Sequence, residues 1–188
     1  MLLIDLMRAY FTPSSPLDLG SDAAVEASGA LLASARKHHL PVVHTVVHYR
    51  AGAVDAGLFA KKVSALLLLA DDQPGGLREL MPQVAPLPAE PVIIKQYASA
   101  FFGTSLSSTL SALGVDTVVI AGVSTSGCIR ASATDAMQHG FRPMVVGDAC
   151  ADRTDELHRS NLRDLNAKYA DVLDSAEVLA RFAAFGSG

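Results

Sequence analysis

The sequence predicts a three-layer α/β/α protein built around a doubly wound, six-stranded parallel sheet, and three observations predict it. Short aliphatic runs alternate with stretches of helical period along the whole chain. The runs are apolar at successive positions, as in residues 41–47 (PVVHTVV), which is typical of parallel strands covered on both faces. The length of 188 residues and the 50% hydrophobic content suit one domain over residues 1–188 with a large aliphatic core.

The first half of the chain supplies three predicted strands. The run MLLI predicts a strand over residues 1–5, and Ser21 with Asp22 predicts the start of a helix over 21–38. A strand over 41–48 follows. The next segment, over 50–90, is rich in Gly, Pro and Ala and contains a short helix, and its length indicates a lid or an interface arm. The run PVII then predicts a strand over 91–95.

The second half continues the alternation. A helix over 103–113 ends before Gly114, and the run TVVIAG predicts a strand over 116–122. A helix over 127–139 ends before Gly140. The remaining predicted elements are a strand over 142–146, a helix over 154–168, a strand over 171–174 and a helix over 175–184. Strands separated by helices in this way imply right-handed crossovers and a parallel sheet.

Composition and charge exclude several classes of function. The net charge is −4, and the 15 Lys and Arg residues are scattered, so we expect no nucleic-acid partner. The only cysteines are Cys128 and Cys150, and the chain opens in a strand without a signal-like leader, which favours a reducing cytoplasm. The longest apolar stretch, over 63–70, is too short to cross a membrane and predicts a buried helix.

Three polar residues stand where predicted strands end. Asp5 and Lys95 each end an apolar run, and Cys128 follows a turn of small residues between a strand and a helix. Carboxyl ends of parallel strands share one edge of the sheet, so these side chains can converge on one site. A cysteine at a helix N-terminus can have its pKa lowered, so we expect Cys128 to be a nucleophile.

These residue types suit hydrolysis of an amide without a metal. A thiolate attacks a carbonyl carbon and forms a thioester, which water then hydrolyses. Asp5 can take the thiol proton and give it to the leaving amine, and a charged Lys95 can hold Asp5 and the thiolate ionised. Backbone N–H groups of the turn over 123–128 can bind the oxyanion.

Three sequence blocks carry a resemblance to a known family. Residues 4–11 (IDLMRAYF), 94–101 (IKQYASAF) and 121–130 (AGVSTSGCIR) resemble the isochorismatase-like cysteine hydrolases in order and spacing. The resemblance covers essentially the whole chain and is strongest to the branch of N-carbamoylsarcosine amidase and maleamate amidase. It implies a Rossmann-like fold of the family type and a triad of Asp5, Lys95 and Cys128.

The resemblance also implies details of binding and assembly. It implies a cis peptide between Val123 and Ser124, with the N–H groups of Ser124 and Cys128 binding the oxyanion. Thr125 and Arg153 are implied to contact a carboxylate of the small-molecule substrate. From the residues alone, Arg153 can equally cap a helix or pair with Asp152. A homo-oligomer is implied, either a tetramer or a dimer.

Metal and cofactor sites are not expected. Nicotinamidases of this superfamily bind a metal through an Asp-x-His-x-x-His segment, whereas residues 55–60 here read DAGLFA. His44 and His48 are four residues apart on a strand, and we interpret them as hydrogen-bonded structural residues. Arg130 is interpreted as structural or interfacial, and Cys150 as a small buried residue.

Four alternative functions are compatible with parts of this pattern. The same fold also serves hydrolases of isochorismate-like vinyl ethers and of ureido acids. A non-catalytic binding protein is a second alternative, against which the retained triad argues. Thiol redox chemistry would require a nearby resolving cysteine, and no Cys-x-x-Cys motif occurs. A dinucleotide enzyme is disfavoured because no Gly-x-Gly-x-x-Gly follows the first strand.

Overall fold

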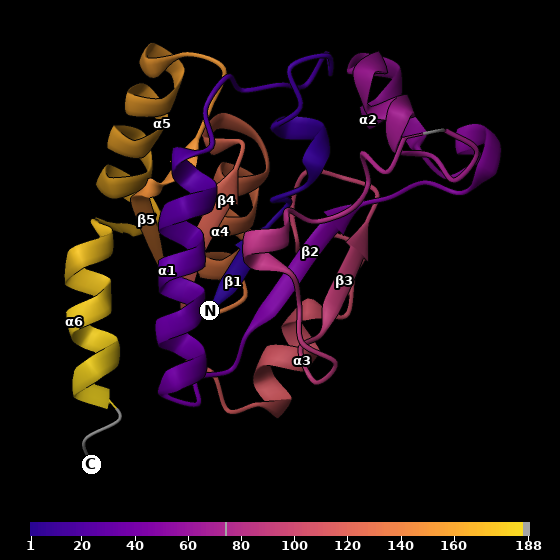
Figure 1. Ribbon diagram of the computed structural model, residues 1–188. Coiled ribbons are helices and arrows are strands. Elements are labelled where there is room, and N and C mark those ends of the chain that lie inside the picture. Colours follow the sequence, from indigo (N-terminus) through magenta and orange to yellow (C-terminus); the bar gives the residue numbers. More distant parts are fainter. Residues whose placement is uncertain (74, 186–188) are drawn as a thin grey trace.

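A six-stranded parallel sheet forms the centre of the computed structural model, which describes residues 1–73 and 75–185 (Figure 1). The strand order is β3-β2-β1-β4-β5-β6. The strands are β1 (Leu2–Ile4), β2 (Val43–Val47), β3 (Val92–Lys95), β4 (Thr117–Val123), β5 (Arg142–Ala151) and β6 (Asp171–Leu173). The direction of winding reverses between β1 and β4, and ligands of such sheets bind beyond the carboxyl ends of the strands at this reversal.

Helices cover both faces of the sheet, as the sequence predicts. On one face α1 (Ala23–Lys37) packs against α6 (Ser175–Phe185), and Figure 1 shows the two helices side by side. Their apolar residues share a core with Leu3 and Val47 of the sheet. The other core joins Leu2 and Ile120 to three further helices. These are α3 (Leu106–Ala112), α4 (Arg130–Gln138) and α5 (Asp155–Lys168).

Two strands differ from their predicted form. β5 extends to Ala151, five residues beyond the predicted end, although Gly147 and Asp148 interrupt the apolar run. Its extension pairs with β4 after a register shift and carries the chain toward the carboxyl edge. β3 is an edge strand with Val92 and Ile94 exposed, so the expectation that both faces are covered is wrong there.

The segment between β2 and β3 is built mainly of short helical turns. It contains α2 (Gly57–Lys62) and several 3-10 turns, among them Ser64–Leu69. Figure 1 shows α2 beyond the carboxyl ends of β2 and β3. Bridges from Tyr49 to Ala70 and from Met7 to Leu80 attach the segment to the sheet. The apolar stretch over 63–70, which was predicted to be a buried helix, forms the 3-10 turn Ser64–Leu69 instead.

A partly buried ion cluster joins α1 to the starts of β2 and β3. Glu90 accepts hydrogen bonds from Arg36 Nε and Nη2, each 2.8 Å long, and from the Leu87 N–H. The Nε2 atom of His44 lies 3.1 Å from the same carboxylate. The hydrogen bond from Arg36 is the main cause that lowers the pKa of Glu90 to about 2, and burial opposes it.

We expect Glu90→Gln to lower the free energy of unfolding by about 1–3 kcal/mol at pH 7, because the variant leaves Arg36 without its charged partner. A carboxylate with a depressed folded pKa stabilises fully above its unfolded value, 4.5, and this contribution is lost as the pH falls toward about 2. The difference between variant and wild type should therefore shrink over that window in urea unfolding. Glu79→Gln, whose ion pair with Arg8 is exposed, is the matched control, and equal losses in both variants would contradict the account.

Candidate active site

The three predicted catalytic side chains meet at the carboxyl edge of the sheet. Asp5 follows β1, Lys95 ends β3 and reaches across β2, and Cys128 lies just after β4. Lys95 Nζ is 2.7 Å from Asp5 Oδ2 and 3.3 Å from Cys128 Sγ. Asp5 and Lys95 are completely buried, and Cys128 is 4% exposed. The geometry thus brings a carboxylate, an ammonium and a thiol together in one buried cluster.

The backbone and β2 together orient the Asp5 carboxylate. Asp5 has a φ of 52°, a left-handed conformation that Asp adopts more readily than most residues. Its N–H donates to the Thr45 carbonyl, and the Thr45 hydroxyl donates to Asp5 Oδ1 over 2.6 Å. Oδ2 lies 2.7 Å from Lys95 Nζ, and among the described residues no backbone N–H or hydroxyl donates to it as Thr45 does to Oδ1. That oxygen therefore keeps a lone pair that can accept the thiol proton.

Lys95 remains an ammonium in spite of its burial. Its Nζ contacts Asp5 and Cys128 and donates to the Tyr97 carbonyl over 3.1 Å, so each of its three protons has an acceptor nearby. Burial alone would lower the pKa of Lys95, but the charge of the neighbouring Asp5 carboxylate raises it above its usual value. The positive charge is available to stabilise a thiolate.

Cys128 differs from the expectation in its resting state. Burial raises the pKa of the Cys128 thiol to about 12, and the proximity of Lys95 only partly opposes this effect. The thiol also lies within a π-helical turn, Thr125–Ile129, that precedes α4, and not at the start of a regular α-helix. The expected lowering of its pKa by a helix N-terminus is therefore outweighed by desolvation. Burial thus favours the neutral thiol, which needs a base to become a nucleophile.

Residues 124–128, the nucleophile loop, begin at a cis peptide between Val123 and Ser124, as the resemblance implies. The Ser124 carbonyl accepts hydrogen bonds from the N–H groups of Gly127 and Ile129. The Ser124 N–H donates no hydrogen bond to any residue within 1–73 and 75–185. A free N–H beside the thiol is what an oxyanion requires.

Glycine is needed where β4 enters this loop. At Gly122, which has a φ of 128°, a Cβ atom would lie 2.0 Å from the Ile4 carbonyl oxygen. At Gly127 a Cβ atom would lie 2.7 Å from the Ser124 hydroxyl. The small residues of the sequence motif thus allow the backbone to approach β1 and to fold tightly around the thiol.

The two predicted substrate-binding residues, Thr125 and Arg153, differ in burial and in their hydrogen bonds. Thr125 is fully buried, and its hydroxyl contacts the Ala151 carbonyl at 3.1 Å and His158 Nδ1 at 2.8 Å. Arg153 is exposed, and only its backbone N–H bonds to Asp152. Its guanidinium has no hydrogen bond or ion pair within the described part of the chain. Arg153 is consequently free to bind an anion.

Sequence reasoning missed three residues near the site. Tyr10 is buried, which raises the pKa of its phenol, and the charge of Asp5 raises it further. Burial likewise raises the pKa of Tyr49 to about 12, and its hydroxyl donates to the Gln96 carbonyl. His158 lies one turn into α5, after the capping residue Thr154. The position of Tyr49 just beyond β2 was the available signal.

The other residues singled out in the sequence have structural partners. His44 bonds to Glu90, and His48 Nε2 lies 2.7 Å from Asp71 Oδ1, so both histidines are hydrogen-bonded as predicted. Arg130 binds Asn161 and Asp164 and thereby links α4 to α5. Cys150 is buried, which raises the pKa of its thiol to about 12. Over residues 1–73 and 75–185, no group of three His, Cys, Asp or Glu residues is arranged to hold a metal ion.

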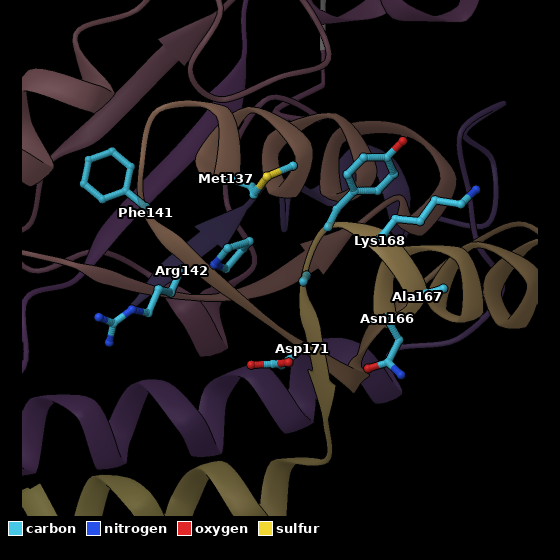
Figure 2. A pocket seen from close by; sticks show the side chains of 10 residues that line it. Met137, Phe141, Arg142, Asn166, Ala167, Lys168 and Asp171 are labelled. Carbon is cyan, nitrogen blue, oxygen red and sulfur yellow. The ribbon is translucent and has the colours of Figure 1, made fainter.

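A hollow of about 420 Å³ lies on the opposite edge of the sheet (Figure 2). Arg142 and Asp171, which begin β5 and β6, line it together with Met137, Asn166 and Lys168. The amino ends of strands carry none of the triad residues. We therefore place the candidate active site at the carboxyl edge and not in this hollow.

Comparisons with known proteins give one family. The isochorismatase domain model matches residues 1–177. A maleamate amidohydrolase of Pseudomonas putida is 47% identical over 181 residues, which cover 95% of this chain and 84% of that protein. The N-carbamoylsarcosine amidase of an Arthrobacter species is 31% identical over 94% of this chain and 68% of its own length.

The solved structures agree with the sequence comparison. The crystal structure of an isochorismatase family protein from Desulfovibrio vulgaris superposes with a TM-score of 0.86 at 30% identity, covering 97% of this chain and 96% of that one. None of the helices in the described residues has both the length and the apolar character that a membrane span needs.

Proposed function

We propose that this chain, which belongs to the isochorismatase family and is an amidohydrolase of C–N amide bonds, acts on a small carboxylate-bearing amide or ureido compound through a Cys128 thioester. The contact of Lys95 with both Asp5 and Cys128 carries the proposal. An ammonium shared by a carboxylate and a thiol stabilises the charge that develops on sulfur when the thiol proton leaves.

The reaction starts from a neutral thiol. Asp5 accepts the Cys128 proton as sulfur attacks the carbonyl carbon, and the oxyanion forms near the N–H groups of Ser124 and Cys128. Asp5 then protonates the leaving nitrogen, which departs as ammonia and leaves the thioester. Asp5 next takes a proton from water, which attacks the thioester and restores the thiol as the acid product leaves.

Recognition of a carboxylate is assigned to Arg153. The two relatives are named for maleamate and N-carbamoylsarcosine, and both compounds carry a carboxylate near the C–N bond. The free guanidinium of Arg153 stands just past β5 at the same edge as the triad. Thr125 is the second predicted carboxylate ligand. To bind the substrate, its hydroxyl would have to give up its contact with either the Ala151 carbonyl or His158 Nδ1.

We expect Arg153→Ala to raise KM for carboxylate-bearing amides by about tenfold to a hundredfold, with a smaller change in kcat, because a charged hydrogen bond is lost. The assay is ammonia release from matched amides with and without a carboxylate, and the neutral amides should respond little. Arg163→Ala, an exposed arginine on α5, is the control. An equal change in KM for amides with and without a carboxylate would show that Arg153 does not bind the substrate carboxylate.

The same screen tests the function as a whole. Ammonia release from one or more carboxylate-bearing amides, unchanged by a chelator, supports the proposal. Turnover only of vinyl ethers would favour an isochorismatase-type reaction, and turnover only of ureidoacrylate-like compounds would favour the corresponding hydrolase. No turnover of any compound would favour a non-catalytic binding protein. A reducing compartment such as the cytoplasm suits the two free thiols.

We also expect a homo-oligomer, either a dimer or a tetramer, in which the 50–90 segment contributes to the interface. Leu66 and Leu69 of this segment are buried in their own chain, but Val54 and Leu58 are 73% and 74% exposed. Removing these apolar side chains from water by packing them against a partner subunit would favour assembly. Light scattering after size exclusion measures the assembly, and a monodisperse monomer at micromolar concentration would contradict it. In an oligomer, Leu58→Glu should weaken assembly.

A further inference from the structure

A set of hydrogen bonds beyond β5 fixes the nucleophile loop from one side. Thr125 Oγ1 contacts the Ala151 carbonyl and His158 Nδ1, and the Ser126 N–H donates to Asp152 Oδ2 over 2.6 Å. Asp152 is nearly buried and also accepts from the Arg153 N–H over 2.8 Å. The loop that carries the thiol is thus attached to the turn between β5 and α5.

Accounting for the protons in this set assigns the His158 tautomer. The Thr125 hydroxyl has one proton, and the Ala151 carbonyl can only accept a hydrogen bond. When the hydroxyl donates to Ala151, the 2.8 Å contact with His158 requires a proton on Nδ1, which donates to Thr125 Oγ1. The opposite tautomer would leave the Ala151 carbonyl without this donor. Burial lowers the pKa of His158, which favours a neutral ring with a single N–H.

We propose that His158 is a positioning residue that holds the nucleophile loop in place by donating from Nδ1 to the Thr125 hydroxyl. Thr125 directly follows Ser124, whose N–H is free, and shares the π-helical turn Thr125–Ile129 with Cys128. A shift of Thr125 therefore displaces both the oxyanion donor and the thiol. Displacement of reacting groups by about 1 Å can cost a hundredfold in rate.

The expected effect of His158 on kcat rests on the proposed function, whereas its expected effect on the position of the nucleophile loop does not. We expect His158→Ala to lower kcat for ammonia release by about tenfold to a hundredfold, with a smaller effect on KM. His158→Asn places an amide N–H near the position of Nδ1 and should restore most of the rate. His158→Gln places its amide near Nε2 and should not. Arg163→Ala, on the same helix, should behave as the wild type.

A double-mutant cycle with Thr125→Val tests whether His158 acts through Thr125. The readouts are kcat and the rate at which iodoacetamide alkylates Cys128, measured by mass spectrometry and independent of any substrate. We expect His158→Ala to change both rates in the wild-type background and neither in the Thr125→Val background. If His158→Ala does not fold by circular dichroism, His158→Gln takes its place in the cycle.

Two results would overturn the inference. One is wild-type kcat and alkylation rate in a folded His158 variant that lacks the Nδ1 donor. The other is that His158→Ala lowers kcat and changes the alkylation rate as much in the Thr125→Val background as in the wild type. That result would show that His158 does not act through Thr125. If the wild type releases ammonia from no amide, the proposed function fails, and the alkylation rates alone decide the role of His158.

Discussion

Cys128→Ala is expected to abolish ammonia release, lowering turnover by about 10⁴-fold or more, because only the sulfur can form the thioester. The fold should persist, because the change removes one atom from a core that α4 and β4 already pack. Cys128→Ser should be equally inactive, since a hydroxyl is a far weaker nucleophile in the absence of a stronger base. Steady-state ammonia release and thermal unfolding measure the two effects.

Cys150→Ser is the matched control for this substitution. Cys150 is also buried, and burial raises its pKa to about 12 as it does for Cys128, but it contacts neither Asp5 nor Lys95. The variant should keep most of its activity. An inactive Cys150 variant together with an active Cys128 variant would show that the nucleophile is assigned to the wrong residue.

Asp5→Asn and Lys95→Met are each expected to lower turnover by about 10²–10⁴-fold, for different reasons. Asp5→Asn removes the base that must take a proton from a thiol whose pKa is about 12. Lys95→Met removes the ammonium that stabilises the thiolate and leaves the Asp5 carboxylate buried without a counter-charge. Breaking a buried ion pair in this way costs about 3–5 kcal/mol of stability.

The double variant Asp5→Asn with Lys95→Met separates stability from catalysis. It removes both charges, so it should unfold closer to the wild-type midpoint than Lys95→Met does, while remaining inactive. Thermal unfolding and ammonia release on the three variants give the comparison. Activity in Lys95→Met near the wild-type level would show that the ammonium is not required for the thiolate.

Much of the fold could be predicted from the sequence because apolar runs, and the glycine and polar residues that end them, are local signals. The six strands, their helical connections and the carboxyl-edge positions of Asp5 and Lys95 all depend on where a run of buried residues stops. The end of β5 could not be predicted in the same way. Gly147 and Asp148 look like a turn, and only pairing with β4 after a register shift keeps the strand extended through Cys150.

The properties of the site depend on contacts between distant segments, which sequence patterns do not contain. The position of Cys128 before a helix suggested a low pKa, but the burial of its thiol has the larger effect and raises the pKa. The hydrogen bond of His158 to Thr125 joins residues 33 positions apart, and nothing in the composition of the predicted helix over 154–168 marks it. The meeting of Asp5, Lys95 and Cys128 was predictable because each lies at the end of a strand or in the turn that follows one, whereas His158 lies within a helix.

The central claim is that Cys128 forms a thioester with the acyl part of the substrate, and trapping that species tests it most directly. The wild-type enzyme would be mixed with a turned-over amide, quenched in acid within the first turnover, digested and analysed by mass spectrometry. We predict a peptide containing Cys128 that has gained the mass of the substrate less ammonia, absent from Cys128→Ser and from unreacted enzyme. Turnover that proceeds with no adduct on Cys128, or with the adduct on Cys150, would contradict the account.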